Sequence, residues 1–252
     1  MDAIEALEQL AADPLVGGRL TRLEVAPARP ARYAETERPL HPEVLERLAA
    51  RRAERLYTHQ AEAIDRLRAG RSVALATATG SGKSLCYQVP IAEAALAGEK
   101  STALMLFPTK ALAHDQLRAL RSWLVPGLRA VTYDGDTPVE DRAALRRTAN
   151  VVLTNPEMLH VGILPYHDRW ATFLMRLRYV VIDELHTLRG IFGSHVAHLL
   201  RRLRRICLHY GSEPAFCFAS ATIGNPAGLA AELGGLPVDA VDDAGSPRGP
   251  RA

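Results

Sequence analysis

One segment of small and polar residues constrains the fold of this chain most strongly: residues 77–84 read Thr-Ala-Thr-Gly-Ser-Gly-Lys-Ser. An apolar run over 72–76 precedes the segment, and a helical pattern that starts at Leu85 follows it. Strand, loop and helix in this order are the setting that a phosphate-binding loop requires. The sequence therefore predicts a βα unit whose loop binds phosphate. The alternative is a glycine- and serine-rich loop that carries a lysine by chance.

Each residue type in this segment suits the binding of a nucleotide. Gly80 and Gly82 can adopt backbone angles that other residues avoid, which lets successive N–H groups point at one phosphate. We expect Lys83 to reach the β- and γ-phosphates and Ser84 to offer its hydroxyl to Mg²⁺, an ion that takes few protein ligands. The residues of this loop predicted to bind the nucleotide are Thr79, Gly80, Ser81, Gly82, Lys83 and Ser84.

The rest of the chain alternates between two patterns. Short apolar runs rich in β-branched residues recur at 102–107, 130–133, 151–154, 179–183 and 215–220, with a weaker run at 238–241. Helical patterns lie between most of them, at 85–97, 110–124, 139–148, 195–210 and 226–233, whereas 162–178 reads as a short helix with a loop. The alternation predicts an α/β fold with a mostly parallel β-sheet, helices on both faces and functional loops at the carboxyl ends of the strands.

Length and local composition indicate how the chain is divided. With 252 residues, the chain is long enough for one large α/β domain with a sizeable core or for two small domains, and we favour one domain. We expect this domain to cover residues 40–241 and to follow an N-terminal extension over 1–39. The segment 242–252 is rich in Asp, Gly, Pro and Arg, a composition typical of a linker at a domain boundary.

Cysteine usage and charge bear on the compartment and the partners. The three cysteines include no C-x-x-C pair, which argues for a reducing compartment and against a zinc site. The acidic N-terminus and the lack of a long apolar run argue against a signal peptide and a membrane span, so we expect a cytoplasmic protein. The net charge is only +3. Arginines nevertheless cluster at 146–147 and 201–205, which suits a polyanionic partner and equally a solvated helix face.

A carboxylate pair follows one of the predicted strands. Asp183 and Glu184 come directly after the apolar run 179–182, and His186 stands two residues further on. We expect this strand to lie next to the strand of the phosphate loop in the parallel sheet, where Asp183 can hold Mg²⁺, usually through water. Glu184 can then orient and deprotonate the attacking water. The alternative for two adjacent acidic residues is an ordinary surface turn.

Hydroxyl and amide side chains stand at three other strand ends. Ser220 and Thr222 follow the run 215–219, where they can hydrogen-bond to His186 and sense a γ-phosphate, or simply cap the next helix. Thr109, Thr154 and Asn155 stand at strand-to-helix junctions, where hydroxyls and helix N-terminal N–H groups can bind the phosphates of a nucleic acid. Ordinary helix capping is the alternative for these residues as well.

Taken in order, the motifs resemble the first motor domain of the superfamily 2 DExH-box helicases, which has a RecA-like phosphate-loop fold. They are the phosphate loop, Pro-Thr-Lys-Ala-Leu at 108–112, Thr-Asn-Pro-Glu-Met-Leu at 154–159, Asp-Glu-Leu-His at 183–186 and Ser-Ala-Thr at 220–222. The resemblance covers roughly residues 40–241. It implies that ATP and Mg²⁺ are the cofactors, that Gln60 reads the adenine and that Tyr57 stacks on it. It further implies a hydrolytic pair, Asp183 and Glu184, with His186, Ser220 and Thr222 as couplers.

Three further stretches resemble one branch of these helicases more closely: 56–60, Tyr-Asp-Gly-Asp-Thr at 133–137, and 187–196. They are similar to the DNA-repair helicases of the mitomycin-repair-factor branch, akin to the RecQ-four-like enzymes. This resemblance implies ATP-driven translocation along single-stranded DNA in the 3′-to-5′ direction.

No Q-x-x-G-R-x-x-R pattern, the arginine-finger motif of a second motor domain, follows Val241. The resemblance implies that ATP lies between two motor domains, so we expect this chain to be half of a helicase motor that binds nucleotide and hydrolyses it poorly. An RNA helicase of the same superfamily and a non-hydrolysing, ATP-dependent interaction module remain alternatives. A small-molecule kinase is disfavoured by the Asp-Glu-Leu-His motif.

Overall fold

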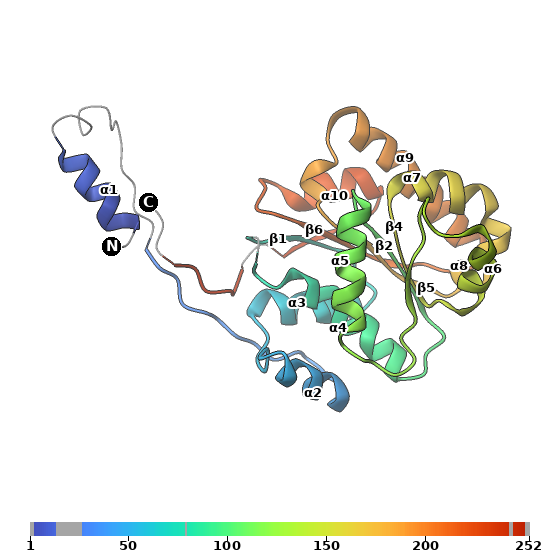
Figure 1. Ribbon diagram of the computed structural model, residues 1–252, viewed down its shortest axis with the longest axis horizontal. Helices are drawn as coiled ribbons and strands as arrows, with labels where there is room; N and C mark the ends of the chain where they lie inside the picture. The colour runs from blue at the N-terminus through green and yellow to red at the C-terminus, as the bar shows by residue number, and fades with distance from the viewer. Residues whose placement is uncertain (1–2, 14–26, 79, 242–243, 250–252) are drawn as a thin grey trace.

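The computed structural model describes residues 3–13, 27–78, 80–241 and 244–249 (Figure 1). Its centre is a seven-stranded sheet with the strand order β3-β4-β2-β5-β6-β1-β7, in which every pair of neighbours is parallel. The strands are β1 Val73–Ala76, β2 Thr102–Leu106, β3 Ala130–Thr132, β4 Val151–Thr154, β5 Leu177–Ile182, β6 Ala215–Ser220 and β7 Asp239–Val241. All seven predicted apolar runs are strands, and the predicted fold class is confirmed.

The helices follow the predicted alternation. The α-helices are α1 Ala3–Ala12, α2 Pro42–Ala50, α3 Thr58–Arg68, α4 Lys83–Leu96, α5 Lys110–Arg121, α6 Val139–Thr148, α7 Pro156–Met158, α8 Ala171–Met175, α9 Gly190–His209 and α10 Pro226–Gly234. The structure differs from the prediction between α7 and β5, where helical turns replace the expected loop: a π-helix over Leu159–Ile163 and a 3₁₀ helix over Leu164–Trp170 lead directly into α8. Burial of Leu159, Leu164 and Trp170 holds this segment against the sheet.

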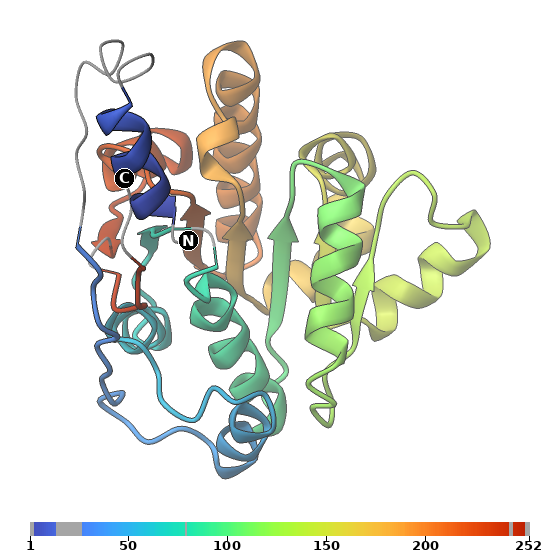
Figure 2. The same cartoon turned by 60° about the vertical axis from the view of Figure 1, so that its left-hand side comes forward.

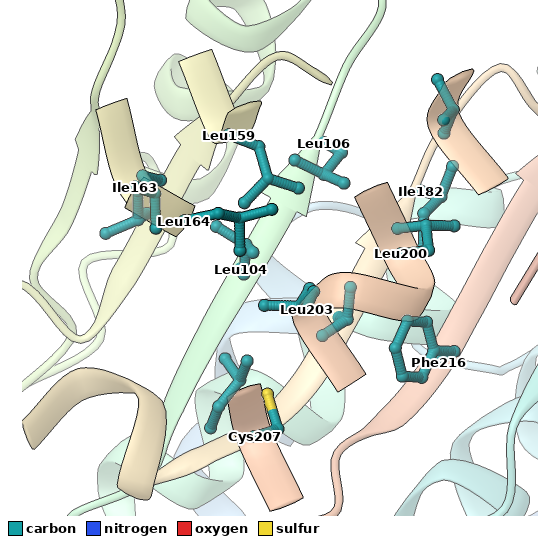
Figure 3. Packing of buried hydrophobic residues seen from close by; sticks show 14 of the residues in the cluster. Leu104, Leu106, Leu159, Ile163, Leu164, Ile182, Leu200, Leu203, Cys207 and Phe216 are labelled. Carbon is teal, nitrogen blue, oxygen red and sulfur yellow. The ribbon is translucent and has the colours of Figure 1, made fainter. Parts of the chain in front are cut away.

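The two faces of the sheet bury alternate residues of the same strands. On one face, Leu104 and Ile182 pack against α9, α10 and the segment 159–175, as Figure 3 shows for part of this cluster. On the other face, Met105 and Val181 pack against α3, α4 and α5 (Figure 2). The helix α2 adds a third layer, because Val44 and Leu48 pack on the outer side of α3 and α4. This double-sided burial fixes the sheet that carries the loops described below.

Backbone hydrogen bonds join the segments 27–36 and 244–249 to each other and to the start of α3. The segment around Arg29 pairs in an antiparallel bridge with Arg248, and Tyr33 pairs in the same way with Tyr57. Gly245 N–H donates to His59 Nδ1 at 3.1 Å, in a contact where an added Cβ on Gly245 would lie 2.5 Å from the backbone oxygen of Arg32. The domain limits 1–39, 40–241 and 242–252 stay predictions, since 1–2, 14–26, 242–243 and 250–252 lie outside the described residues.

The arginine cluster of α9 has a structural role in part. Arg201 donates to the carbonyl oxygen of Glu232 at 2.9 Å, and Arg204 donates to the carbonyl oxygens of Gly234 and Gly235. These contacts satisfy carbonyl groups at the C-terminus of α10, where cations also interact favourably with the helix dipole. Arg201 and Arg204 therefore help to hold α10 against α9, and polyanion binding by the cluster stays a prediction.

Within the described part of the chain, the helices are all too short or too polar to cross a membrane. Cys86, Cys207 and Cys217 are buried free thiols. Burial raises the pKa of Cys86 to about 12 and that of Cys207 to about 11. Both side chains therefore pack as small neutral apolar groups rather than as reactive thiolates.

Candidate nucleotide-binding site

The predicted phosphate loop connects β1 to α4. Thr77 Oγ1 and Ser81 Oγ lie 2.6 Å apart and hold the two sides of the loop together. Gly80 and Gly82 have φ angles of +79° and +78°, in the left-handed region where glycine is favoured. The turn therefore leads directly into the N-terminus of α4, whose first N–H groups have no partner within the helix. Thr79, which we predicted to bind the nucleotide, lies outside the described residues.

Lys83 folds back over this loop. Its Nζ donates to the carbonyl oxygens of Thr77 at 2.7 Å and of Ala78 at 3.0 Å. Burial lowers the pKa of the Lys83 ammonium, and the carboxylates of Asp183 and Glu184 counteract part of this decrease. The ammonium thus already stands at the mouth of the loop, where a bound phosphate would replace the two carbonyl oxygens as its partner.

Gln60 braces the phosphate loop from α3. Its Nε2 donates to the carbonyl oxygen of Gly82 at 3.0 Å, its Oε1 accepts from Tyr57 N–H at 2.9 Å, and 2% of the residue is exposed. A Cβ atom on Gly82 would lie 2.5 Å from Gln60 Nε2, so the close approach requires glycine. The Tyr57 ring stacks on Tyr33 and on His59, with centroid distances of 5.4 and 5.9 Å. The adenine contacts of Gln60 and Tyr57 stay predictions.

The carboxylate pair lies at the end of β5, where Asp183 N–H still donates to the carbonyl oxygen of Leu106 at 3.0 Å. The prediction that this strand adjoins the strand of the phosphate loop is wrong, because β6 lies between β5 and β1. Ser220 is the last residue of β6 and the register partner of Ala76 in β1. The position of β6 therefore places Ser220 between the carboxylate pair and the phosphate loop. Asp183, Ser220 and the phosphate loop are therefore at the carboxyl ends of three adjacent strands.

The local backbone orients the two carboxylates differently. Asp183 Oδ1 accepts from Glu184 N–H at 2.8 Å, whereas Glu184 adopts a left-handed φ of +55°, a strained conformation for a residue with a side chain. His186 Nδ1 lies 3.2 Å from Glu184 Oε2. Asp183 thus remains packed under the site, while Glu184 turns out of the strand direction toward His186.

The electrostatic environment of Asp183 opposes ionisation. Burial raises the pKa of its carboxyl group, and the Glu184 carboxylate raises it further. The Glu184 N–H that donates to it and the Lys83 ammonium act in the opposite direction without cancelling the increase. A nearby cation would therefore stabilise the ionised form of Asp183.

This environment predicts the effect of Asp183→Asn on stability. Because the folded-state pKa lies above the unfolded one, the contribution of Asp183 to stability is present at low pH and is lost as the pH rises through the folded pKa. We expect Asp183→Asn to raise the melting temperature at pH 7.5 by about 2–4 °C, the shift that 1 kcal/mol gives in a chain of this size. The difference should shrink toward pH 4. Thermal denaturation over this pH range tests it, with the exposed Asp168→Asn as the matched control; a lower melting temperature at pH 7.5 would contradict it.

The two predicted coupling residues occupy different environments. Ser220 is fully buried, and its Oγ forms no hydrogen bond within the described structure. Thr222 is exposed in the turn before α10. The predicted hydrogen bond from Ser220 to His186 is absent from this structure, and the coupling roles of Ser220 and Thr222 stay predictions.

The predicted nucleic-acid contacts also separate into two kinds. Thr109 and Asn155 are N-caps: Thr109 Oγ1 accepts from Leu112 N–H at 3.4 Å and Asn155 Oδ1 from Met158 N–H at 2.7 Å. Thr154 is placed differently, because its hydroxyl is buried and donates to the carbonyl oxygen of Tyr133 at 2.6 Å. The expectation that Thr154 presents its hydroxyl to a phosphate is therefore corrected: the side chain holds the end of β3 against β4.

One residue next to Asp183 was missed in the sequence. The hydroxyl of Tyr87 lies 3.5 Å from Asp183 Oδ2, and a hydrogen bond with Ser84 affects its pKa. Tyr87 stands four residues after Lys83 in α4, one helical turn along the same face. That spacing could have indicated a place for Tyr87 beside the phosphate loop. A tyrosine among the apolar residues of a helix, however, is usually part of the hydrophobic core.

The donor set around Tyr87 fits Mg²⁺ bound together with a nucleotide. Ser84 and Asp183 both contact the Tyr87 hydroxyl, so a hydroxyl oxygen and a carboxylate oxygen face one small region beside the phosphate loop. Mg²⁺ prefers oxygen ligands and commonly takes only one or two protein ligands besides phosphate oxygens and water. The described residues contain no cluster of three or more His, Cys, Asp or Glu side chains suited to a metal.

Comparisons with known proteins agree with this geometry. Residues 57–228 match the DEAD/DEAH box helicase family. The chain is 46% identical over 225 residues to the uncharacterized ATP-dependent helicase YprA of Bacillus subtilis. The aligned region covers 86% of this chain and 30% of YprA. It is 43% identical over 231 residues to the ATP-dependent helicase hrq1 of Schizosaccharomyces pombe. This aligned region covers 88% of this chain and 22% of hrq1.

The same agreement holds for solved structures. The crystal structure of the DUF1998 helicase MrfA bound to DNA matches with a TM-score of 0.92 and 40% identity, over 99% of this chain and 33% of that chain. This chain therefore spans about a third or less of the length of these relatives.

A parallel sheet with a phosphate loop, a carboxylate pair and a buried hydroxyl at the ends of three adjacent strands defines the RecA-like class of nucleotide-binding domains. Within that class, this chain belongs to the DEAD/DEAH box helicase family. The similarity to hrq1 and MrfA confirms the predicted resemblance to the mitomycin-repair-factor and RecQ-four-like branch.

Proposed function

We propose that this chain is an ATP-binding motor domain of a DNA helicase that moves along single-stranded DNA. The observation that carries the proposal is the convergence of Asp183 after β5, Ser220 at the end of β6 and the phosphate loop with Lys83 after β1. The similarity to MrfA, which is bound to DNA in its crystal structure, supports DNA as the nucleic acid.

In this proposal the phosphate loop binds ATP. The α4 N-terminus and Lys83 bind the β- and γ-phosphates, Gln60 reads the adenine edge and Tyr57 supports the base. Ser84 and Asp183 would hold Mg²⁺, which neutralises negative charge on the phosphate oxygens when it is bound. The hydrogen bond from Gln60 to Gly82 supports a link between the proposed base site and the phosphate loop.

Glu184 is the proposed general base of hydrolysis. Its carboxylate orients the attacking water and accepts its proton, while Lys83 stabilises the charge on the transferred phosphoryl group. His186 lies close enough to Glu184 to respond to a change in that carboxylate. Ser220 and Thr222 are the proposed acceptors of this response, and the free hydroxyl of Ser220 supports the role.

The nucleic-acid strand is proposed to cross the carboxyl edge of the sheet. Thr109 stands at the N-terminus of α5, whose N–H groups can bind a phosphate, and the backbone near Asn155 offers a second contact. Contacts of this kind bind the strand independently of its sequence. From the branch resemblance, we propose movement in the 3′-to-5′ direction in DNA repair.

A second RecA-like motor domain is the proposed partner of this chain. It would supply an arginine to the γ-phosphate, a contribution worth about 10³–10⁵ in rate in related enzymes. Addition of such a domain should therefore raise ATP hydrolysis by this chain strongly. The fraction of its relatives that this chain spans supports the proposal.

The proposal is tested by measuring the binding of labelled single-stranded DNA and of RNA with the same sequence by fluorescence anisotropy. We expect DNA to bind more tightly than RNA, since the 2′-hydroxyl lets a protein distinguish the two. With roughly two to four phosphate contacts, the affinity should fall about 7- to 50-fold between 50 and 200 mM salt. ATP should bind in the same protein sample with Mg²⁺ present.

Each other outcome selects one of the alternatives. Preference for RNA would replace the DNA helicase by an RNA helicase. Binding of ATP without nucleic-acid binding, and without hydrolysis after addition of the second motor domain, would identify an ATP-dependent interaction module instead.

A further inference from the structure

A chain of polar side chains runs from the nucleotide site into the face of the sheet covered by α4 and α5. The Tyr87 hydroxyl lies 3.5 Å from Asp183 Oδ2 and 3.5 Å from Gln116 Oε1. Gln116 Oε1 also accepts from Gln88 Nε2 at 3.3 Å, and Gln88 Oε1 accepts from Trp123 Nε1 at 3.1 Å. The exposed fractions of Tyr87, Gln88 and Trp123 are 2%, 2% and 1%, whereas Gln116 is partly exposed.

Trp123 fixes the direction of the whole chain. An indole N–H can only donate, so the carbonyl oxygen of the Gln88 amide must face Trp123. The Gln88 NH₂ group therefore faces Gln116, and Gln116 must present its carbonyl oxygen. That oxygen is turned toward the Tyr87 hydroxyl as well. Both glutamine amides are thus held in one orientation by a group far from the nucleotide.

The Tyr87 hydroxyl consequently has one hydrogen and two acceptors. Burial, together with the Asp183 carboxylate, raises its pKa well above the ordinary value, so the hydroxyl keeps its hydrogen. Asp183 and Gln116 can each accept that hydrogen, but only one of them at a time. Both separations lie beyond the range of about 2.5–3.0 Å of an ordinary O–H···O hydrogen bond, so the hydroxyl stands between its two acceptors and is held tightly by neither.

The two acceptors belong to different parts of the proposed motor. Asp183 is a proposed ligand of Mg²⁺, and Ser84, the other proposed ligand, also contacts Tyr87. Gln116 lies in α5, the helix whose N-terminus is capped by Thr109 at the proposed nucleic-acid edge. Among these hydrogen-bonded residues, Tyr87 therefore contacts both the proposed Mg²⁺ ligands and α5.

We infer that Tyr87 is a positioning residue that couples nucleotide binding to the grip of α5 on a nucleic acid. This inference rests on the proposed function. When Asp183 has no cation, it accepts the Tyr87 hydrogen. A cation held by Asp183 would compete with the Tyr87 hydrogen for the carboxylate, and the hydrogen would then turn to Gln116, which would gain a hydrogen bond and hold α5 in one position. Nucleotide and nucleic-acid affinities then depend on each other.

The test measures the affinity of the full chain for single-stranded DNA with and without Mg²⁺ and AMPPNP, a non-hydrolysable ATP analogue. We expect the nucleotide to change the DNA affinity about five-fold or more in the wild type, the lower range of allosteric coupling. In Tyr87→Phe, which removes only the hydroxyl, the change should fall below about two-fold. The affinity for AMPPNP alone, and for DNA alone, should stay within about two- to three-fold of the wild type, as a loss of coupling requires.

Gln116→Met gives a second, independent variant, because it removes the other acceptor at a partly exposed position. The Tyr87→Phe, Gln116→Met double variant should lose no more coupling than either single variant, as expected for residues that act in one chain. Tyr210→Phe is the matched control: its hydroxyl contacts His167 Nδ1 at 2.8 Å, outside this chain of hydrogen bonds, and its removal should leave the coupling intact.

The outcomes separate this inference from the proposed function. If the wild type binds neither nucleotide nor DNA, the proposed function fails. If it binds both and Tyr87→Phe keeps the full coupling, or if the wild type shows no coupling, the inference on Tyr87 is overturned while the proposed function stands. A purely structural role for Tyr87 would lower stability and both affinities together, and would leave their dependence on each other unchanged.

Discussion

Lys83→Ala is expected to lower the affinity of this chain for ATP by about 100-fold. The ammonium makes two hydrogen bonds to Thr77 and Ala78, which the phosphate oxygens would take over. Hydrogen bonds that involve a charged group contribute about 1.5–3 kcal/mol each, and a loss of about 2.7 kcal/mol corresponds to a 100-fold change in affinity. Alanine would also remove the positive charge that lowers the pKa of Asp183.

Isothermal titration with AMPPNP and Mg²⁺ measures this effect. Lys100→Ala is the matched control, because Lys100 is an exposed lysine just beyond the other end of α4. The control should bind AMPPNP like the wild type. If Lys83→Ala bound within three-fold of the wild type, while remaining folded, nucleotide would have to bind elsewhere and the proposed site would be wrong.

The parts of the fold that depend on neighbouring residues could be predicted from the sequence. Apolar runs of β-branched residues and helical spacing are local signals, and all seven predicted strands are present. The phosphate loop could be recognised for the same reason, since Gly80 and Gly82 take the left-handed angles that the loop requires. The positions of Asp183 and Glu184 also followed, because a buried strand in a parallel sheet delivers the next residues to its carboxyl edge.

Contacts between distant segments could not be predicted in this way. The sequence gives no order for the strands, so the place of β6 between β5 and β1 became clear only in the structure. Thr154 looks like any residue at a strand end, yet its hydroxyl turns inward to Tyr133. Arg201 and Arg204 look like solvated charges, yet they donate to the end of α10, about 30 residues further along the chain.

The same limit explains why Tyr87 was missed. A tyrosine between apolar residues of a helix has the pattern of a core residue, and Tyr87 is indeed in the core. Its polar end matters only because β5 brings Asp183, and α5 brings Gln116, within reach of the hydroxyl. The polar contacts of Tyr87 depend on the packing of α4, α5 and β5, so no local sequence pattern predicts them.

Glu184→Gln is expected to slow ATP hydrolysis by about 100- to 10,000-fold, the usual contribution of a positioned general base. The amide has the same shape as the carboxylate but cannot accept the proton of the attacking water. The left-handed φ of +55° at this position is independent of the end of the side chain, so glutamine should keep the local backbone. Because Lys83 and Ser84 are untouched, nucleotide affinity should change much less than the rate.

Single-turnover hydrolysis of labelled ATP, with protein in excess over nucleotide, measures this rate for the chain alone and after addition of a second motor domain. The matched control is Glu157→Gln, the same chemical change at an exposed glutamate on the same edge of the sheet, and it should hydrolyse ATP like the wild type. Equal rates for Glu184→Gln and the wild type would assign the base to another residue. A rate and an affinity that fell together would point to a misplaced phosphate loop, because a missing general base affects the chemical step and not the binding of ATP.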